Sequence, residues 1–494
     1  MIPPEKKARN DENKENKDRL SDLPDAVILH ILSFLNIKHA VQTCVLSTRW
    51  KHKWKHIPTL ILHSSRFSTK KHFSKFVSKI LTLRDSSTAL HTLDVERDGI
   101  MEPKLLKKIL NYVCSYNTHI QQLRINVTAD SCLILNCVSK CRALTSLKLA
   151  HPGNRKNYKE TLLPTSLNLP LLTSLDLTYF TFYGGENGCA EPFSAFAKLN
   201  SLVIRHCTVK DARILSISSE TLVDLTMLNN SSDFDKIELS LPSSLSAFTF
   251  TGVHVLKIRG NGLSSVKHVT IVAHDYEASV KYPLILLSWL QGLANVESLR
   301  VTSTTLQILS LVPDLLVVKL SSLSNLKSLE VELFPVRYEE LSRLMEEAML
   351  KKAADKSPKE VAKLRKMFKA GLTPPPIPDG IVDFLRQNSP FAKVNVTTKF
   401  PDYFNLKQVE EFVNGTKNTS DHSQFPVSGS GAAPASAAEF ASATTPASTA
   451  PPNLQLCPAE EVTIIPHMLF EFLLIFGCHT TTFMVFSNTF LRNK

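Results

Sequence analysis

One short hydrophobic pattern, apolar-x-x-apolar-x-apolar, recurs through the middle of the chain. Its ten copies begin at Leu90, Ile120, Leu144, Leu172, Leu199, Leu222, Leu245, Val266, Val296 and Leu326. The last three positions of each copy alternate apolar, free and apolar, as in a strand with one buried face. Short repeats of this kind cannot close a core alone, so neighbours share one. The pattern therefore predicts a parallel sheet built one strand per repeat.

The free position of each predicted strand forms a second pattern. It holds Asp94, Arg124, Lys148, Asp176, Val203, Thr226, Thr249, Thr270, Arg300 and Glu330. Stacked repeats place equivalent positions side by side, so we expect these residues to lie in one row on the concave face. Their signs are mixed and the middle of the row is neutral, which does not suit a groove that follows phosphates. A protein surface or a small ligand fits the row better.

Before the repeats, residues 19–57 have the hydrophobic spacing of short helices. After Pro24 and Asp25, which suit a first helical turn, one stripe at i, i+3, i+4 and i+7 holds Ile28, Ile31, Leu32 and Leu35. Three apolar residues lie off that stripe: Val27, Leu29 and Phe34. The helix is therefore apolar on more than one face, and so short a helix cannot bury all of this surface alone.

Two more short helices are predicted next. Ala40, Val41, Cys44 and Val45 repeat the i, i+4 rhythm, and Ser47 is a suitable N-cap for a third helix with Trp50 and Trp54 one turn apart. Three helices with more apolar surface than their own core needs favour docking on a partner protein. The alternative is an ordinary three-helix core without a partner.

After Leu333 the repeat ends and helical spacing begins. The pattern predicts a helix over 338–352, a second opened by a capping box at 357–360, and a short third with Ile381, Phe384 and Leu385. We interpret residues 336–415 as a helical C-terminal cap, because a stacked array must cover its last repeat.

The end of the sequence, residues 416–494, falls into two parts of different character. Residues 416–461 are rich in Ser, Ala, Thr, Pro and Gly, which indicates a low-complexity linker. Residues 462–494 form a hydrophobic tail almost long enough to span a membrane, but Glu471, His467 and His479 lie inside it. A membrane anchor, a short docking segment and sequence from an imprecise gene model all remain open for the tail.

The amino-acid composition excludes few classes of protein. The chain has 494 residues, 43% hydrophobic and 21% charged, which is typical of globular protein, and a formal charge of +12 that is scattered in short runs. We interpret the runs, including Lys351 to Lys369, as solvated helix faces and expect no nucleic-acid partner. Residues 1–18 lack the apolar stretch of a secretory signal and indicate a disordered, charged tail, in which Lys6, Lys7 and Arg9 form at most a weak nuclear signal.

No motif of a known chemistry is present. The sequence has no GxSxG elbow, P-loop, HExxH helix or GxGxxG turn, so we expect no enzyme activity, no cofactor and no metal site. Nine cysteines without a CxxC pair indicate reduced thiols inside a cell. Cys132, Cys137 and Cys141 lie close together, but their spacing matches no common zinc pattern.

Residues 19–57 resemble an F-box, in the form found in plant F-box proteins with leucine-rich repeats. The matching residues include Leu23-Pro24-Asp25, Ile28-Leu29, Phe34-Leu35, Val45-Leu46-Ser47 and Arg49-Trp50, whereas His39 and the basic run 52–56 depart from the usual pattern. The repeats resemble the irregular leucine-rich repeats of the same proteins, with the typical turn residue found only at Cys207 and Asn230. An unrelated α/β domain with leucine-rich strands is the alternative.

The resemblance implies an α+β multidomain protein. Its parts would be a three-helix F-box at residues 19–60, a connecting helical segment at 61–89, an α/β leucine-rich-repeat solenoid with a parallel-sheet horseshoe at 90–335, and the helical cap. It further implies a substrate-recognition subunit of a ubiquitin ligase that binds an SKP-type adaptor, through it a cullin, and an unknown protein target, in the cytoplasm and/or nucleus.

The implied adaptor-binding residues are Leu20, Leu23, Pro24, Ile28, Leu29, Ile31, Leu32, Leu35, Val45, Leu46 and Trp50. The expected target-binding residues are Arg124, Lys148, Asp176, Arg205, Arg300 and Glu330. Three alternatives stay open: a small-molecule receptor, a stand-alone binding scaffold, and an adaptor tethered to a membrane by the hydrophobic tail.

Overall fold

A computed structural model describes residues 22–409, apart from 117, 152–160, 165–166, 231–237, 254, 275–280, 336–338, 405 and 408. The expectations for the N-terminal tail, Leu20, the linker and the hydrophobic tail lie outside these residues. Within them, no helix is long and apolar enough to cross a membrane.

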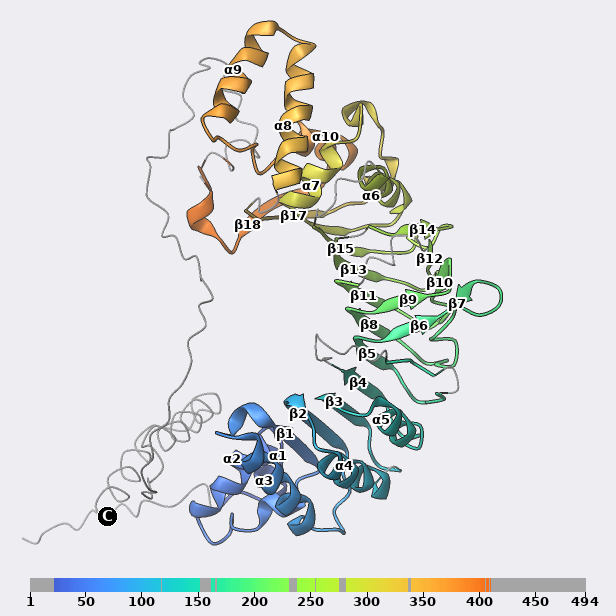
Figure 1. The fold of residues 1–494 in the computed structure, drawn as a ribbon, viewed down its shortest axis with the longest axis vertical. Helices are drawn as coiled ribbons and strands as arrows, with labels where there is room; N and C mark the ends of the chain where they lie inside the picture. The colour runs from blue at the N-terminus through green and yellow to red at the C-terminus, as the bar shows by residue number, and fades with distance from the viewer. Residues whose placement is uncertain are drawn as a thin grey trace, which may run out of the picture. The chain divides into compact units, whose positions relative to one another are not determined.

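Twelve parallel strands form one sheet. Figure 1 shows successive strands of this sheet lying side by side. In spatial order they are β1 (Thr59–His63), β2 (Thr92–Ile100), β3 (Gln122–Thr128), β4 (Ser146–Ala150), β5 (Ser174–Thr178), β8 (Ser201–Arg205), β11 (Asp224–Leu228), β13 (Ala247–Gly252), β15 (His268–Ala273), β16 (Ser298–Thr302), β17 (Ser328–Leu333) and β18 (Lys393–Thr398). The ten strands of this sheet from β2 to β17 each begin two residues after a predicted repeat start. The prediction of one parallel strand per repeat is confirmed.

Equivalent repeat positions lie side by side in the sheet. All ten residues that begin the repeats, from Leu90 to Leu326, have no exposed surface. The predicted row also forms: Asp94 pairs in register with Arg124, and the pairing continues strand by strand to Glu330. Burial of each leucine contributes roughly 1.5–3 kcal/mol, so the shared core stabilises the stack.

The other face of the sheet is covered by helices near its ends and by short strands in its middle. The helices are α3 (Lys70–Leu83), α4 (Pro103–Ser115), α5 (Ser131–Val138), α6 (Lys281–Gly292) and α7 (Ser303–Ser310). The short strands are β6 (Thr181–Tyr183) with β9 (Thr208–Lys210), and β7 (Cys189–Ala190), β10 (Ile214–Ser216), β12 (Glu238–Ser240) and β14 (Lys257–Arg259) in a sheet of their own. Three short 3-10 helices also form: η3 (Ser64–Arg66), η5 (Leu315–Val317) and η6 (Ser321–Leu323).

The N-terminal helices differ in part from the prediction. Helix α1 (Asp25–Ser33) and helix α2 (Ile37–Gln42) form, but the third element is short 3-10 helix, η1 (Thr43–Val45) and η2 (Lys53–His56). A three-helix F-box is therefore not confirmed. Both tryptophans expected on the third helix, Trp50 and Trp54, are buried.

The sheet also begins earlier than the predicted repeats. Strand β1 pairs with β2 and buries Leu60 and Leu62, so the segment expected to be only helical contributes the first strand before α3 begins. Ile57, Leu60 and Leu62 have the spacing of the repeats, and Ile57 is buried like the residues that begin them. One further copy of the repeat pattern, beginning at Ile57, therefore accounts for this strand.

At the other end, the expected helical cap is not confirmed. Helices α8 (Glu339–Ala354), α9 (Pro358–Lys369) and α10 (Ile381–Asn388) form, but the sheet itself continues to β18, which pairs directly with β17, before η7 (Pro401–Tyr403). Helix α10 buries Ile381, Phe384 and Leu385, as its spacing predicted. Helix α9 buries no residue.

Candidate functional site

The N-terminal helices bury one side of α1 and expose another. Ile28 and Leu32 have no exposed surface, and Trp50 is buried as well. Val27 and Phe34 lie seven residues apart on a different face and are 41% and 60% exposed.

A further exposed apolar side chain follows in η1, where Val45 is 75% exposed. Exposed apolar side chains on elements that already have a core are available for contact with a protein partner. We call Val27, Phe34 and Val45 the apolar surface.

Polar contacts hold the start of α1 against η2. Asp25 accepts hydrogen bonds from Arg49, at 2.9 Å, and from Lys53. These contacts, with Lys53 as the larger cause, lower the pKa of the Asp25 carboxyl, so it is ionised at neutral pH. Asn36 caps the start of α2, because its side chain accepts a hydrogen bond from the backbone N–H of Lys38 at 3.0 Å.

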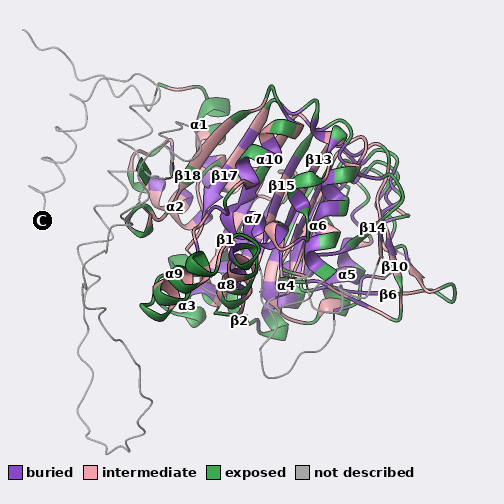
Figure 2. Ribbon diagram, turned by 90° about the horizontal axis from the view of Figure 1, so that it is seen from above, coloured by how far each residue is buried: buried purple, intermediate pink, exposed green. Residues whose placement is uncertain are grey.

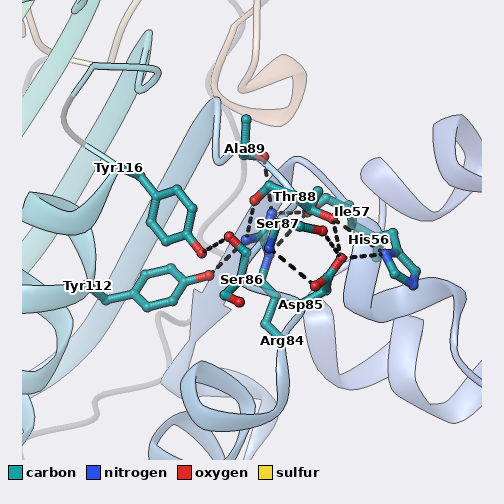
Figure 3. A network of polar contacts seen from close by, with 10 residues as sticks. All are labelled: His56, Ile57, Arg84, Asp85, Ser86, Ser87, Thr88, Ala89, Tyr112 and Tyr116. Atoms are coloured by element: carbon teal, nitrogen blue, oxygen red, sulfur yellow. Dashed lines mark hydrogen bonds and ion pairs between the residues drawn. The ribbon is translucent and has the colours of Figure 1, made fainter.

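Arg84 joins the N-terminal helices to the first repeats, as Figure 3 shows. Its Nη2 donates to the carbonyl of Ile57 at 2.8 Å and to that of Ala89 at 3.1 Å, and its Nη1 donates to the carbonyl of Thr88 at 3.0 Å and to the Tyr112 hydroxyl at 2.8 Å. Ile57 ends the N-terminal segment, Ala89 precedes β2, and Tyr112 lies on α4. One buried guanidinium therefore fixes three segments together.

A carboxylate lies beside this joint. Asp85 accepts hydrogen bonds from the side chain and the backbone N–H of Ser87, and these lower the pKa of its carboxyl to about 2. Its Oδ2 lies 3.1 Å from Nδ1 of His56. The turn between α3 and β2 is thus held by contacts of Asp85 as well as by those of Arg84.

We call the face of the sheet that carries the row from Asp94 to Glu330 the open face. Its charged residues fall into two groups. In the first, Oδ2 of Asp176 lies 3.2 Å from Nζ of Lys148 and 3.5 Å from Nη2 of Arg205. Arg124 and Asp94 lie on the preceding strands, 3.7 Å apart. These residues come from neighbouring repeats, and each charge has a partner of opposite sign on another strand.

The second charged group lies on the last strands. Arg300 approaches Glu330 at 3.8 Å and Glu332 at 3.1 Å, and Nζ of Lys399 lies 3.0 Å from Glu332. Between the groups, the row is uncharged and half-buried at Val203, Thr226, Thr249 and Thr270. The open face thus offers paired charges on either side of a stretch of methyl and hydroxyl groups.

Two small cavities lie among the described residues. The two best-defined cavities hold about 10 Å³ each and are lined mainly by core residues, Ile271 and Leu299 in one and Ile125 and Leu149 in the other. A cavity of this volume holds roughly one water molecule.

The cysteines in the described part of the chain are free thiols. Sγ of Cys114 and Sγ of Cys137 lie 3.3 Å apart. The pKa of the Cys114 thiol is raised to about 11, and burial is the largest cause of this shift. Among the described residues, no group of three or more His, Cys, Asp or Glu could hold a metal ion.

A family model described as the F-box domain matches residues 20–62. The chain carries an F-box domain. The match covers α1, α2, the 3-10 helices η1 and η2 and most of β1, so the apolar surface belongs to the F-box domain.

The chain is also similar to plant proteins of the same kind. A putative FBD-associated F-box protein of Arabidopsis thaliana is 28% identical over 44% of this chain and 45% of its own length. F-box/LRR-repeat protein 13 of the same plant is 26% identical over 44% of this chain and 47% of its own length. Another F-box/LRR-repeat protein of that plant is 26% identical over 59% of this chain and 67% of its own length. The resemblance to plant F-box/leucine-rich-repeat proteins is confirmed.

The matched region spans less than half of the first two relatives. Among solved structures, a TLR13–ssRNA13 complex matches 56% of this chain and 42% of that chain, with 12% identity and a TM-score of 0.27. So distant a likeness supports no argument about this chain.

The structure divides the implied adaptor-binding residues into three sets. Ile28, Leu32 and Trp50 are buried in the core of the F-box domain, so the contacts seen for them are internal. Leu23, Leu29, Ile31, Leu35 and Leu46 are half-buried, and Pro24 and Val45 are exposed. An adaptor role for these residues stays a prediction.

The sequence prediction left Val27 and Phe34 out of the adaptor set. Both lie off the apolar stripe of α1, and this offset was the signal that they face outward. The six expected target-binding residues all lie on the open face, with Lys148, Asp176 and Arg205 together and Arg300 beside Glu330. Their role in binding a target stays a prediction.

Proposed function

We propose that this chain is a substrate-recognition subunit of an SKP–cullin–F-box type ubiquitin ligase. The F-box domain docks on an SKP-type adaptor and thereby on a cullin, and the open face of the sheet holds the protein target. The observation that carries the proposal is the F-box domain itself, folded with Phe34 and Val45 exposed.

The chain acts as a tether. Catalysis belongs to other subunits, and the chain raises the effective concentration of the target near the ubiquitin donor. A tether works best when its geometry is fixed, and the buried Arg84 joint supports such rigidity between the F-box domain and the first repeats.

The geometry of the open face also limits the target. Its charges are already paired across strands, so a target gains most from the uncharged stretch at Val203, Thr226, Thr249 and Thr270. We expect a protein segment with uncharged side chains at its centre and charged ones at both ends.

The test uses the full chain and a pair of matched double variants. Phe34→Asp/Val45→Asp places two carboxylates on the apolar surface of the F-box domain. Phe391→Asp/Val317→Asp is the control, because Phe391 is 83% and Val317 79% exposed and neither belongs to the F-box domain. Each variant is mixed with a purified SKP-type adaptor, and complex formation is measured by size-exclusion chromatography and calorimetry.

The unmodified chain and the control should form a one-to-one complex. The F-box variant should bind at least roughly 100-fold more weakly, because hot-spot side chains contribute about 2 kcal/mol or more each. If the unmodified chain does not bind the adaptor, the proposal fails and the repeats are better explained as a stand-alone scaffold. Equal binding by both variants would place the docking surface elsewhere.

A small-molecule receptor is the less favoured function, because the two cavities described above hold only about 10 Å³ each. We also propose a cytoplasmic and/or nuclear location, which the free thiols of the described cysteines support.

A further inference from the structure

The segment from the end of α8 through α9 carries more lysines and arginines than any other stretch of the same length in the described chain. Its eight cations, all exposed, are Lys351, Lys352, Lys356, Lys359, Lys363, Arg365, Lys366 and Lys369. Asp355 and Glu360 are the only carboxylates among them, so positive charges outnumber negative ones by eight to two. We call residues 351–369 the basic segment.

The cations of α9 are segregated on one side of the helix. Lys359, Lys363 and Lys366 lie at i, i+4 and i+7 and share a face, whereas Val361 and Phe368 lie on the opposite side. Within the described part of the chain, no ion pair neutralises any of the eight cations. The basic face is therefore both exposed and uncompensated.

The apolar side of α9 is only partly covered. Val361, Leu364, Met367 and Phe368 are all half-buried, and Figure 2 shows α9 largely in the colour of exposed residues. A helix with a charged face and a loosely covered apolar stripe is typical of elements that rest on an interface.

Stability of the sheet does not explain the basic segment. Strands β17 and β18 pair directly along six residues, so the sheet is continuous without the residues inserted between them. Helix α9 buries none of its own residues. Eight neighbouring like charges, moreover, repel one another at low ionic strength.

We propose that the basic segment binds an anionic lipid surface. Clusters of four to eight lysines and arginines on an amphipathic helix match the negative surface of membranes, and seven of the eight cations here are lysines, which act as point charges. Its basic face carries no aromatic side chain on which bases could stack, so single-stranded nucleic acid fits less well. The contact is peripheral and independent of the proposed ligase function.

The test measures sedimentation of the full chain with two kinds of vesicle, phosphatidylcholine alone and phosphatidylcholine with phosphatidylserine. The test variant removes four charges: Lys359→Gln, Lys363→Gln, Lys366→Gln and Lys369→Gln. The control removes the same number from α3 and α4: Lys71→Gln, Lys75→Gln, Lys79→Gln and Lys104→Gln. All of these lysines are exposed, so both variants should keep the circular dichroism of the unmodified chain.

The unmodified chain and the control should sediment with the anionic vesicles and not with neutral ones. The test variant should bind at least roughly 100-fold more weakly, because each lysine near the surface strengthens binding roughly fivefold. Raising NaCl from about 0.1 M to about 0.5 M should release the bound protein.

Three results would overturn the proposal. One is equal binding by the test variant and the unmodified chain. Another is an equal loss in the control, since net charge alone would then explain binding. The third is no binding to anionic vesicles, whether or not a duplex DNA or a polyglutamate probe binds instead.

Discussion

Replacing Arg84 with methionine should weaken the joint between the F-box domain and the repeats. Methionine has a similar length and fills the same space, but it donates no hydrogen bond. The variant removes the five hydrogen bonds that the guanidinium donates to the carbonyls of Ile57, Thr88 and Ala89 and to the Tyr112 hydroxyl.

The expected cost follows from the buried acceptors. Arg84 is 5% exposed, so water does not easily replace its donors. A buried carbonyl left without a donor costs about 1–3 kcal/mol; the buried Ile57 carbonyl loses both of its Arg84 donors, and the part-buried Ala89 carbonyl loses one. Packing of the methionine offsets part of this, and we expect a loss of about 3 kcal/mol in the free energy of unfolding at this end of the chain.

Tryptophan fluorescence can follow the unfolding of the F-box end of the chain separately from that of the repeats. The chain has three tryptophans, of which Trp50 and Trp54 lie in the F-box domain and Trp289 lies in α6. In a Trp289→Phe background, Arg84→Met should move the urea midpoint of the fluorescence change to lower urea. Hydrogen exchange in the strands from β13 to β17 should stay unchanged, because stacked repeats interact mainly with their neighbours.

Arg142→Met is the matched control, because Arg142 is exposed. Arg84→Lys should recover only part of the loss, since an ammonium group cannot reach the same acceptors in one plane. If Arg84→Met shifts the midpoint no more than Arg142→Met, the reasoning is wrong and the joint does not depend on the guanidinium.

Two further predictions concern titration and thiol reactivity. Hydrogen bonds from Ser87 hold the pKa of Asp85 at about 2, so the stabilisation by its carboxylate is complete above the unfolded pKa of about 3.9 and is lost as pH falls toward 2. Asp85→Asn should therefore reduce the pH dependence of the thermal midpoint between these two values. An unchanged pH profile would contradict this. Burial raises the pKa of the Cys207 thiol to about 12, so a thiol reagent at about pH 8 should label exposed Cys132 in the native protein and Cys207 only after unfolding. Mass spectrometry of the labelled peptides checks this, and equal native labelling would refute it.

The repeats could be predicted because the same spacing recurs ten times, and the spacing of each copy indicates a strand with one buried face. The row from Asp94 to Glu330 followed from the same periodicity, since equivalent positions in stacked strands are neighbours. Even the turn residues Cys207 and Asn230 are linked, because the backbone N–H of Cys207 donates to the Asn230 side chain at 2.9 Å.

Elements held by distant partners could not be predicted. Helix α7 is almost fully buried although it is rich in Ser and Thr, and Thr305 shows why: its Oγ1 lies 3.0 Å from both the carbonyl of Ile271 and the backbone N–H of Ala273. Those partners belong to the preceding repeat and are far away in the sequence, so local pattern does not show that the polar side chains are satisfied.

The F-box domain shows a similar limit. The sequence revealed a surplus of apolar residues on α1, but which side faces the core depends on the elements that pack against the helix. Ile28 and Phe34 are both strongly apolar in sequence, yet one is fully buried and the other 60% exposed.

Strand β1 determines where this protein could be recombined with others. The family match ends at residue 62, inside the strand that pairs with β2, so a chimera joined there would cut through the first strand of the sheet and separate Ile57 from Arg84. A transplant of the F-box domain onto another set of repeats would need to carry β1, α3 and Arg84 with it, and to bring Ala89 and Tyr112 or their equivalents as acceptors. Exchange of binding specificity is therefore easier downstream, between in-register strands of the stack, than at the boundary of the F-box domain.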